Sequence, residues 1–322
     1  MLRPALPLRT VGLELVGALP DSIRQRVYDT RRRVELVRDE ADLDRRLARA
    51  AELFGESDDG ARGYLASFRM EAPPMPADPF SPAYAEAQWD LYRRVSGRDG
   101  YTVTHEETHV ELSVHALRPY PYSTGSARQV AAQLAATSFV LRRLDPRPGQ
   151  RVVEFGAGWG NLTLPIAMLG AEVTAVEVGG GLAEVLRRRA AGLTTLRVVE
   201  SDMLGFEPEG EPYDVALFFE SFHHCADHVR LLELLHQVVG DHGRLVFGAE
   251  PVDLLAYPWG PRLDGLSLWS MRRYGWLELG FDERYFAEAL RRTGWRARKV
   301  PGPTPASTTY IATAVANVPE VT

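Results

Sequence analysis

Residues 105–115 have the sequence HEETHVELSVH, and these side chains are the first that could do chemistry. His105, Glu106 and His109 fit the pattern H-E-x-x-H, in which two imidazoles bind one zinc ion and the glutamate acts as a base. His115 lies where some zinc proteases place a third histidine. The pattern works only on a helix, because there positions i and i+4 share one face.

The residues around this pattern favour a strand instead. Six of the positions between 102 and 114 are threonine or valine, and such β-branched residues are common in strands. Four residues of a strand span about 13 Å, which is too far for two histidines to share one zinc ion. We therefore expect an amphipathic strand or hairpin near the active site, with His105, His109 and His115 on its polar face and no metal bound there. A weak metal site completed by residues from elsewhere in the chain stays open.

A glycine-rich turn at residues 151–160, RVVEFGAGWG, points to a different chemistry. A strand over 151–155 is expected to run into Gly156, Gly158 and Gly160 and then into a helix. Glycines allow a tight turn and let a ligand lie against bare backbone, and a helix N-terminus offers free N–H groups. The dinucleotide fingerprint G-x-G-x-x-G is not met, because its third glycine position holds Asn161. No Gly-Lys-Ser/Thr follows, which excludes a P-loop.

Two acidic residues follow the next two apolar runs of the sequence. The run EVTAVEV carries Glu177 near its end, where a carboxylate can accept hydrogen bonds from both ribose hydroxyls of a nucleoside. Asp202 comes directly after the run LRVVES. Because the glycine turn and both carboxylates fall at successive strand ends, the sequence predicts a nucleoside-binding site there.

The spacing E-x-G-x-G-x-G from Glu154 to Gly160 resembles motif I of the class I S-adenosylmethionine (SAM) methyltransferases, with Glu154 in place of the commoner aspartate. The resemblance covers about residues 120–322 and is strongest over 150–250. The segment 258–281 resembles bacterial small-molecule and sugar-associated members. The resemblance implies S-adenosyl-L-methionine as cofactor, with Asp202 on the adenine amino group and Met203 against the ring. The expected cofactor-binding residues are Glu154, Gly156, Ala157, Gly158, Trp159, Gly160, Asn161, Glu177, Val178, Asp202, Met203, Glu220, Tyr122 and Ser123.

The stretch FFESFHHC, residues 218–225, provides the candidate catalytic residues. The preceding strand is expected to end near Glu220 and to direct the next residues at the transferable methyl group. A neutral imidazole of His223 or His224 could take a proton from an acceptor hydroxyl. Glu220 is a competing base and is also placed to hold the amino group of the cofactor.

The elements that must position these residues form an alternating pattern. After residue 126, a helix is followed by apolar runs that alternate with helical patterns, which indicates a parallel sheet with helices on both faces. We expect an α/β, Rossmann-like, doubly wound sheet that is mostly parallel and, by the resemblance, closes with a C-terminal antiparallel hairpin. Helices are expected at 21–54 and 82–97 of an N-terminal region, 1–125, that contributes to the active site. The SAM-binding domain, 126–322, would carry a lid insertion at 251–281.

The composition narrows the possible partners of the protein. The 322 residues include 37 Lys plus Arg and 43 Asp plus Glu, so the net charge is −6. Bulk charge will not hold such a chain on nucleic acid or anionic lipid. A single cysteine, Cys225, cannot form an intrachain disulfide, and no signal peptide or membrane span is evident. We expect a cytoplasmic protein, and the sequence leaves its oligomeric state open.

The leading hypothesis is SAM-dependent methylation of a small polar acceptor at oxygen or nitrogen, such as a natural product or a sugar-like molecule. Two alternatives stay open. The enzyme could cyclise the aminobutyl chain of SAM and release methylthioadenosine, or the chain could be a non-catalytic SAM-binding subunit of another enzyme.

Overall fold

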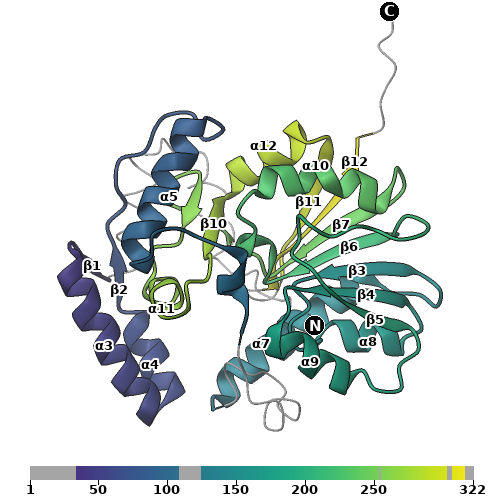
Figure 1. The fold of residues 1–322 in the computed structure, drawn as a ribbon, viewed down its shortest axis with the longest axis horizontal. Coiled ribbons are helices and arrows are strands. Elements are labelled where there is room, and N and C mark those ends of the chain that lie inside the picture. The colour runs from purple at the N-terminus through teal and green to yellow at the C-terminus, as the bar shows by residue number, and fades with distance from the viewer. Residues whose placement is uncertain (1–33, 109–124, 254, 303–306, 316–322) are drawn as a thin grey trace, which may run out of the picture.

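The computed structural model describes residues 34–108, 125–253, 255–302 and 307–315 (Figure 1). Its centre is a seven-stranded sheet with the order β11-β12-β7-β6-β3-β4-β5. Only β12 runs antiparallel to its neighbours, β7 and β11. The strands are β3 (Arg151–Phe155), β4 (Glu172–Glu177), β5 (Leu196–Glu200), β6 (Val215–Phe219), β7 (Arg244–Gly248), β11 (Trp295–Val300) and β12 (Thr309–Ala314). This is the Rossmann-like sheet with a C-terminal antiparallel hairpin that the sequence predicted.

Helices cover both faces of this sheet, which is why its central strands are apolar along their whole length. Figure 1 shows α10 and α12 on one face and α8 and α9 on the other. The sheet therefore exposes only the ends of its strands to a ligand. The helices are α7 (Ala127–Leu144), α8 (Thr163–Met168), α9 (Gly180–Arg189), α10 (His228–Val239) and α12 (Glu283–Arg292). Within the described part of the chain, none of the helices is both long and apolar enough to cross a membrane.

The N-terminal region is mainly helical, but it does not begin with one long helix. Its elements are β1 (Glu35–Val37), α3 (Glu40–Glu56), α4 (Asp58–Leu65), β2 (Phe68–Met70) and α5 (Pro82–Ser96). The helix expected over 21–54 is wrong for residues 35–39, because β1 pairs in parallel with β2 and Asp39 caps the start of α3. Residues 21–33 lie outside the described part. The helix expected over 82–97 is confirmed, with Gly97 in a left-handed conformation at its end.

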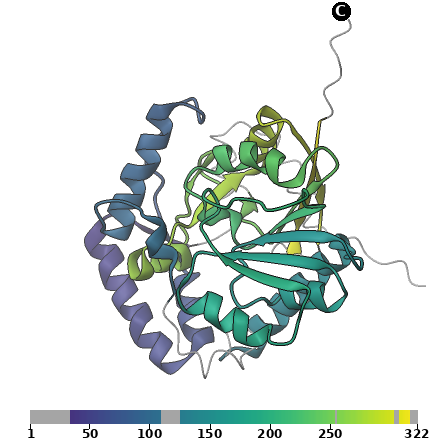
Figure 2. The same ribbon diagram turned by 45° about the vertical axis from the view of Figure 1, so that its right-hand side comes forward.

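The insertion after β7 contains a three-stranded sheet, β8-β10-β9, and one helix. These elements are β8 (Val252–Asp253), β9 (Trp259–Pro261), α11 (Gly265–Tyr274) and β10 (Leu279–Asp282). Figures 1 and 2 show α11 beside the N-terminal helices. The Tyr84 hydroxyl donates to the Trp259 carbonyl at 2.9 Å, and the Tyr92 hydroxyl donates to the Gly275 carbonyl at 2.6 Å. The insertion and the N-terminal region therefore pack as one unit beside the central sheet.

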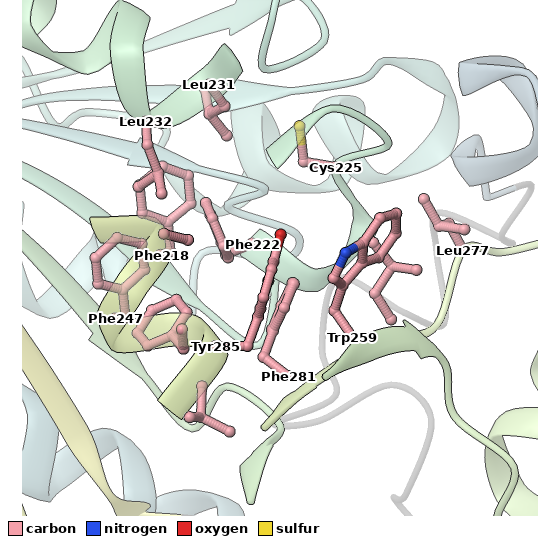
Figure 3. Close-up of a cluster of buried hydrophobic side chains, with 14 of the residues drawn as sticks. Phe218, Phe222, Cys225, Leu231, Leu232, Phe247, Trp259, Leu277, Phe281 and Tyr285 are labelled. Atoms are coloured by element: carbon pink, nitrogen blue, oxygen red, sulfur yellow. The ribbon is translucent and has the colours of Figure 1, made fainter. Parts of the chain in front are cut away.

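A shared aromatic core joins this unit to the sheet (Figure 3). Phe218 of β6 and Phe247 of β7 stack with ring centroids 5.2 Å apart. Phe222, just after β6, contacts both Phe247 at 5.0 Å and Phe281 of β10 at 5.6 Å. Because these rings form one buried cluster, the loop after β6 is fixed between the sheet and the insertion.

Residues 101–108 are not the strand that the sequence suggested. Val103–Glu106 form a 3-10 helix, η1, so the strand prediction is wrong for the described part of this stretch. The turn is stabilised locally, because the Thr102 N–H donates to Nδ1 of His105 at 3.4 Å and the His105 N–H donates to the Thr102 carbonyl at 3.0 Å. His109, His115, Tyr122 and Ser123 lie outside the described residues, so their predicted roles, including the expected absence of a metal site, stay predictions.

Candidate functional site

A cavity of about 560 Å³ opens at the carboxyl ends of β3, β4, β5 and β6. One wall consists of the glycine turn after β3 and the residues that follow β4 and β5. The opposite wall consists of the loop after β6, residues 101–108 and Trp276 of the insertion. We call these the cofactor wall and the acceptor wall. Open α/β sheets bind their ligands at this edge, and the volume suits a small-molecule site.

The three glycines of the turn after β3 have positive φ angles of +66°, +53° and +77° at Gly156, Gly158 and Gly160. A side chain at Gly156 would place its Cβ 2.6 Å from Cβ of Ser221, and one at Gly160 would approach Leu186 to 2.3 Å. Nothing lies within 4 Å of the corresponding position at Gly158, which lines the cavity. The lack of a side chain at Gly156 and Gly160 therefore lets Ser221 and Leu186 pack closely against the turn. Gly158 instead leaves its backbone open to a ligand.

Glu177 at the end of β4 is buried and lines the cavity. Its carboxylate accepts the N–H of Gly158 at 2.7 Å and the N–H of Val178 at 3.1 Å. Burial raises its pKa, and these two N–H donors oppose the rise. A carboxylate has about four acceptor sites, so Glu177 can hold the glycine turn and still accept hydrogen bonds from a ligand.

Asp202 after β5 also lines the cavity, together with Met203 and Val178. One oxygen, Oδ1, accepts the N–H groups of Leu204 and Gly205, both at 2.8 Å. These two bonds fix the side chain and leave Oδ2 for a donor on a ligand. The structure thus brings Gly156, Gly158, Glu177, Val178, Asp202 and Met203 together on the cofactor wall.

Glu154 and Ala157 do not line this cavity. Glu154 is buried beneath the glycine turn, where the Thr163 hydroxyl donates to its carboxylate. Burial raises the pKa of Glu154 to about 8. Ala157 packs in a small apolar cluster with Leu164 and Leu186. Both residues shape the turn, and direct contact with a cofactor stays a prediction for them.

Trp159, Gly160 and Asn161 are likewise absent from the cavity lining. The Trp159 ring is buried, and the Asn161 side chain accepts a hydrogen bond from Arg189 at 3.0 Å. Arg189 also donates to the Trp159 carbonyl at 2.7 Å, so α9 braces the outer side of the turn. Their assignment as cofactor-binding residues also stays a prediction.

His223 and His224 are adjacent in the short 3-10 helix η2 (Phe222–His224), but they face different surroundings. His223 is only 6% exposed, and its Nδ1 lies 2.8 Å from Oε2 of buried Glu250. Glu250 also accepts the N–H groups of Ser221 at 2.8 Å and Phe222 at 2.9 Å. Burial lowers the pKa of His223. Burial alone would raise the pKa of Glu250, but His223 and the N–H donors outweigh it and lower that pKa.

His224 lines the cavity, and its Nδ1 lies 3.1 Å from Oε2 of Glu106. The other oxygen of Glu106 accepts the Leu277 N–H at 2.7 Å. Burial alone would lower the pKa of His224, but the Glu106 carboxylate outweighs it and raises that pKa to about 9. No pattern in the sequence indicated this pair. Its only trace is Glu106 itself, in the pattern that resembled a zinc site.

Glu220 lies at the end of β6 with a φ of +52°, an uncommon conformation for a residue other than glycine. Its side chain lines the cavity and accepts a hydrogen bond from Gln133 at 3.1 Å. The side chain is exposed to solvent, and the surrounding protein raises its pKa. Backbone strain of this kind gathers at functional sites, which suits the predicted role of this residue.

The aromatic residues divide between the cavity and the packing of the insertion. Trp276 and Tyr101 line the acceptor wall. Tyr84 and Trp259 instead pack against each other at 5.5 Å between the N-terminal region and the insertion. Trp276 therefore faces the cavity, whereas Tyr84 and Trp259 join the insertion to the N-terminal region.

Comparison with known proteins identifies the domain that carries this site. Residues 152–243 match the family described as a methyltransferase domain. Residues 152–243 therefore form a methyltransferase domain. Members of this family use S-adenosylmethionine as cofactor. The open backbone at Gly158 and the carboxylates of Glu177 and Asp202 are of the kind that a nucleoside with free hydroxyl and amino groups requires.

Relatives share this methyltransferase domain over part of their length. A protein-L-isoaspartate O-methyltransferase of Methylorubrum populi is 32% identical over 142 residues, which are 44% of this chain and 64% of that protein. A ribosomal RNA small subunit methyltransferase A of Methylibium petroleiphilum is 43% identical over 70 residues, which are 22% and 26% of the two chains. The chain thus covers less than two thirds of these relatives. The structure of the CcbJ methyltransferase from Streptomyces caelestis is 14% identical with a TM-score of 0.49, over 67% of this chain and 100% of that one.

Proposed function

We propose that this protein transfers the methyl group of S-adenosylmethionine to a small polar acceptor. One observation carries the proposal: the cavity has a cofactor wall with open backbone and two carboxylates, and an acceptor wall with an imidazole, a carboxylate and two aromatic rings. A bound SAM molecule supplies an activated methyl group. The protein then has to align the acceptor, keep water out and receive a proton if the acceptor is a hydroxyl.

The cofactor wall supports specific roles for its residues. Glu177 would accept the ribose hydroxyls with the oxygen sites that Gly158 and Val178 leave free. Asp202 would accept the adenine amino group at Oδ2, because its Oδ1 already holds the backbone turn. Met203 would pack on the adenine ring. Tyr122 and Ser123 remain candidates for the methionine carboxylate.

On the acceptor wall, His224 is the better candidate for a proton acceptor than His223. The His224 ring lines the cavity, whereas the His223 ring is committed to Glu250 away from it. Glu220 is the second candidate, because its carboxylate lines the cavity and could hold the cofactor amino group or accept a proton. A general base has to be within reach of the proton before its pKa matters, which is the reason for this ranking.

A small acceptor suits the surroundings of the cavity better than a nucleic acid. Residues of the N-terminal region and of the insertion lie across the acceptor wall, so we propose that residues 1–125 contribute to the active site and that 251–281 form its lid. The net charge of −6 disfavours binding of RNA by bulk electrostatics.

Calorimetric titration with SAM, followed by product analysis, tests the proposed function. We expect binding, and release of S-adenosylhomocysteine when small hydroxy or amino compounds are supplied. Release of methylthioadenosine without an acceptor would instead show attack within the aminobutyl chain. Tight binding without either product would favour a non-catalytic partner subunit, and methylation of ribosomal RNA or intact protein would refute the small-acceptor assignment.

A further inference from the structure

Glu106 links three segments of the chain that are far apart in sequence. It lies in the strap formed by residues 101–108, which comes from the N-terminal region. One carboxylate oxygen faces His224 of the loop after β6 at 3.1 Å, and the other accepts the backbone N–H of Leu277 in the insertion at 2.7 Å. At its far end the strap is also held on the cofactor side, because the Gly181 N–H donates to the Thr108 carbonyl at 3.1 Å.

Resting on the proposed function, we propose that Glu106 is a positioning residue for His224 and that this pair receives the proton of a hydroxyl group on a planar, aromatic acceptor. The assignment deepens the function by naming an acceptor class. It also gives the strap a role in positioning His224, in place of the zinc binding that its H-E-x-x-H pattern suggested.

The orientation of the imidazole is the first argument. Oε2 of Glu106 lies 3.1 Å from Nδ1 of His224, on one side of the ring, so Nε2 is the nitrogen that can accept a proton from a ligand in the cavity. A carboxylate at this distance stabilises the imidazolium that forms. His223 cannot take this role, because its own Nδ1 is bound to Glu250.

The rings around His224 are the second argument, and they bear on the shape of the acceptor. Trp276 meets the His224 ring edge-on, with centroids 6.4 Å apart and planes at 90°. Tyr101 donates its hydroxyl to the His224 carbonyl at 3.3 Å, and its side chain lines the same cavity. Flat aromatic walls bind flat rings through offset or edge contacts.

The chemistry of the proton is the third argument. The charged groups that face His224 are Glu106 from the strap, Glu278 from the insertion, Glu250 from the end of β7, Glu177 from the end of β4, and His223 beside it. Burial would lower its pKa, but the carboxylates prevail and raise it to about 9. A phenolic hydroxyl has a pKa of about 10, so proton transfer to His224 is nearly balanced once the imidazole is neutral, which requires a pH near 9 or above.

The proposed step conserves atoms and charge. As the acceptor oxygen attacks, its proton moves to Nε2 of His224, a C–O bond forms to the methyl carbon, and the C–S bond breaks with its electron pair left on sulfur. The new imidazolium is paired with Glu106. An amine acceptor attacks as the neutral amine and can release its proton after transfer, so it does not need such a pair.

The first test measures the protonation of His224 directly, by NMR titration of its imidazole in wild type and in Glu106→Gln. The His224→Gln variant identifies the signal, and Glu107→Gln, the neighbouring carboxylate, is the matched control. We expect a midpoint near pH 9 in wild type and in Glu107→Gln, and a fall of at least one pH unit in Glu106→Gln. Equal midpoints in all three proteins would overturn the role of Glu106. Because this readout needs no cofactor, it separates failure of the inference from failure of SAM binding, which calorimetry reports independently.

The second test addresses the acceptor class. Phenols and anilines with the same ring skeletons would be supplied with SAM, and S-adenosylhomocysteine release would be measured across pH. We expect turnover of phenols with a rate that rises toward pH 9. In Glu106→Gln, we expect kcat to fall while the KM for SAM is kept, and the rising limb to move to lower pH. Turnover of anilines that survives in His224→Gln, or turnover of neither set by a protein that binds SAM, would overturn the acceptor class.

Discussion

The two walls of the cavity are built in different ways. The cofactor wall comes from one continuous part of the chain, residues 156–205, and backbone N–H groups hold its carboxylates in place. The acceptor wall is assembled from residues 101–108, the loop after β6 and Trp276, and the ion pair between Glu106 and His224 joins two of these segments. Local backbone geometry therefore determines the cofactor wall, whereas side-chain contacts between distant segments determine the acceptor wall.

This difference indicates which part of the molecule can change without loss of cofactor binding, and so alter the specificity for the acceptor. A substitution far along the chain, in the strap or the insertion, can move the acceptor wall without disturbing the glycine turn. The cofactor wall has no comparable freedom, because φ angles between +53° and +77° at its three glycines permit few other residues. The following predictions test this separation between the walls, from the largest expected effect to the smallest.

The largest effect is expected for His224→Gln, which should affect the acceptor wall alone. Turnover should fall about 100-fold or more, because general-base catalysis is usually worth about 10²–10⁴-fold. SAM affinity, measured by calorimetry, should stay near wild type. His242→Gln, the same change at an exposed histidine, is the control. If His224→Gln retains full turnover, the proton leaves by another route and Glu220 becomes the leading candidate.

The next largest effect is expected for Glu250→Ala, which removes the support beneath the acceptor wall. The N–H groups of Ser221 and Phe222 and the ring of His223 would lose a buried partner. Removing one member of such a buried pair typically costs about 3–5 kcal/mol of unfolding free energy. Urea unfolding measures this loss, and Glu172→Ala, at an exposed position, is the control, which should scarcely move the midpoint.

The pH dependence of this effect follows from the lowered pKa of Glu250. A carboxyl group whose pKa is lowered by folding stabilises the fold above its unfolded value of 4.5, and this stabilisation is lost as the pH falls toward the folded value. Wild type and Glu250→Ala should therefore differ most near neutral pH and converge in acid. A constant difference between pH 7 and pH 3 would show that packing, not charge, is what Glu250 contributes.

The cofactor wall could be predicted from the sequence, whereas most of the acceptor wall could not. The strands around the glycine turn, and the positions of Glu177 and Asp202 at strand ends, were predicted because local apolar runs and glycine spacing encode them. The strand expected around His105 was wrong, because hydrogen bonds between Thr102 and His105 stabilise a 3-10 turn. Glu106 then holds this turn against His224 and Leu277, which are distant in sequence. The sequence could not separate His223 from His224, since only the fold places Glu250 beside one and Glu106 beside the other. Likewise, β1 interrupts a helical pattern because its partner strand, β2, lies about 30 residues further on.

A smaller effect is expected for Glu177→Ala, which should affect the cofactor wall alone. The substitution removes the proposed hydrogen bonds to both ribose hydroxyls, and it should cost about 1.5–3 kcal/mol of SAM affinity if the carboxylate is charged. Calorimetric titration measures the loss, with the exposed Glu172→Ala at the start of the same strand as control. The titration midpoint of His224 should stay unchanged if the walls are independent. An unchanged affinity for SAM would remove Glu177 from the cofactor site.

The smallest effect is expected for Asp202→Asn, which replaces one hydrogen-bond acceptor by a donor. The amide oxygen can still accept the N–H groups of Leu204 and Gly205, so the turn after β5 should be kept. The other oxygen becomes an NH₂ group, which donates and cannot accept the adenine amino group. Binding of S-adenosylhomocysteine should weaken by about 1–2 kcal/mol, while its inosine analogue, which presents an oxygen at that position, should bind relatively better. Calorimetry with both compounds gives the ratio of affinities in wild type and variant. A ratio that does not change would mean that another group recognises the base and that Asp202 serves only the turn.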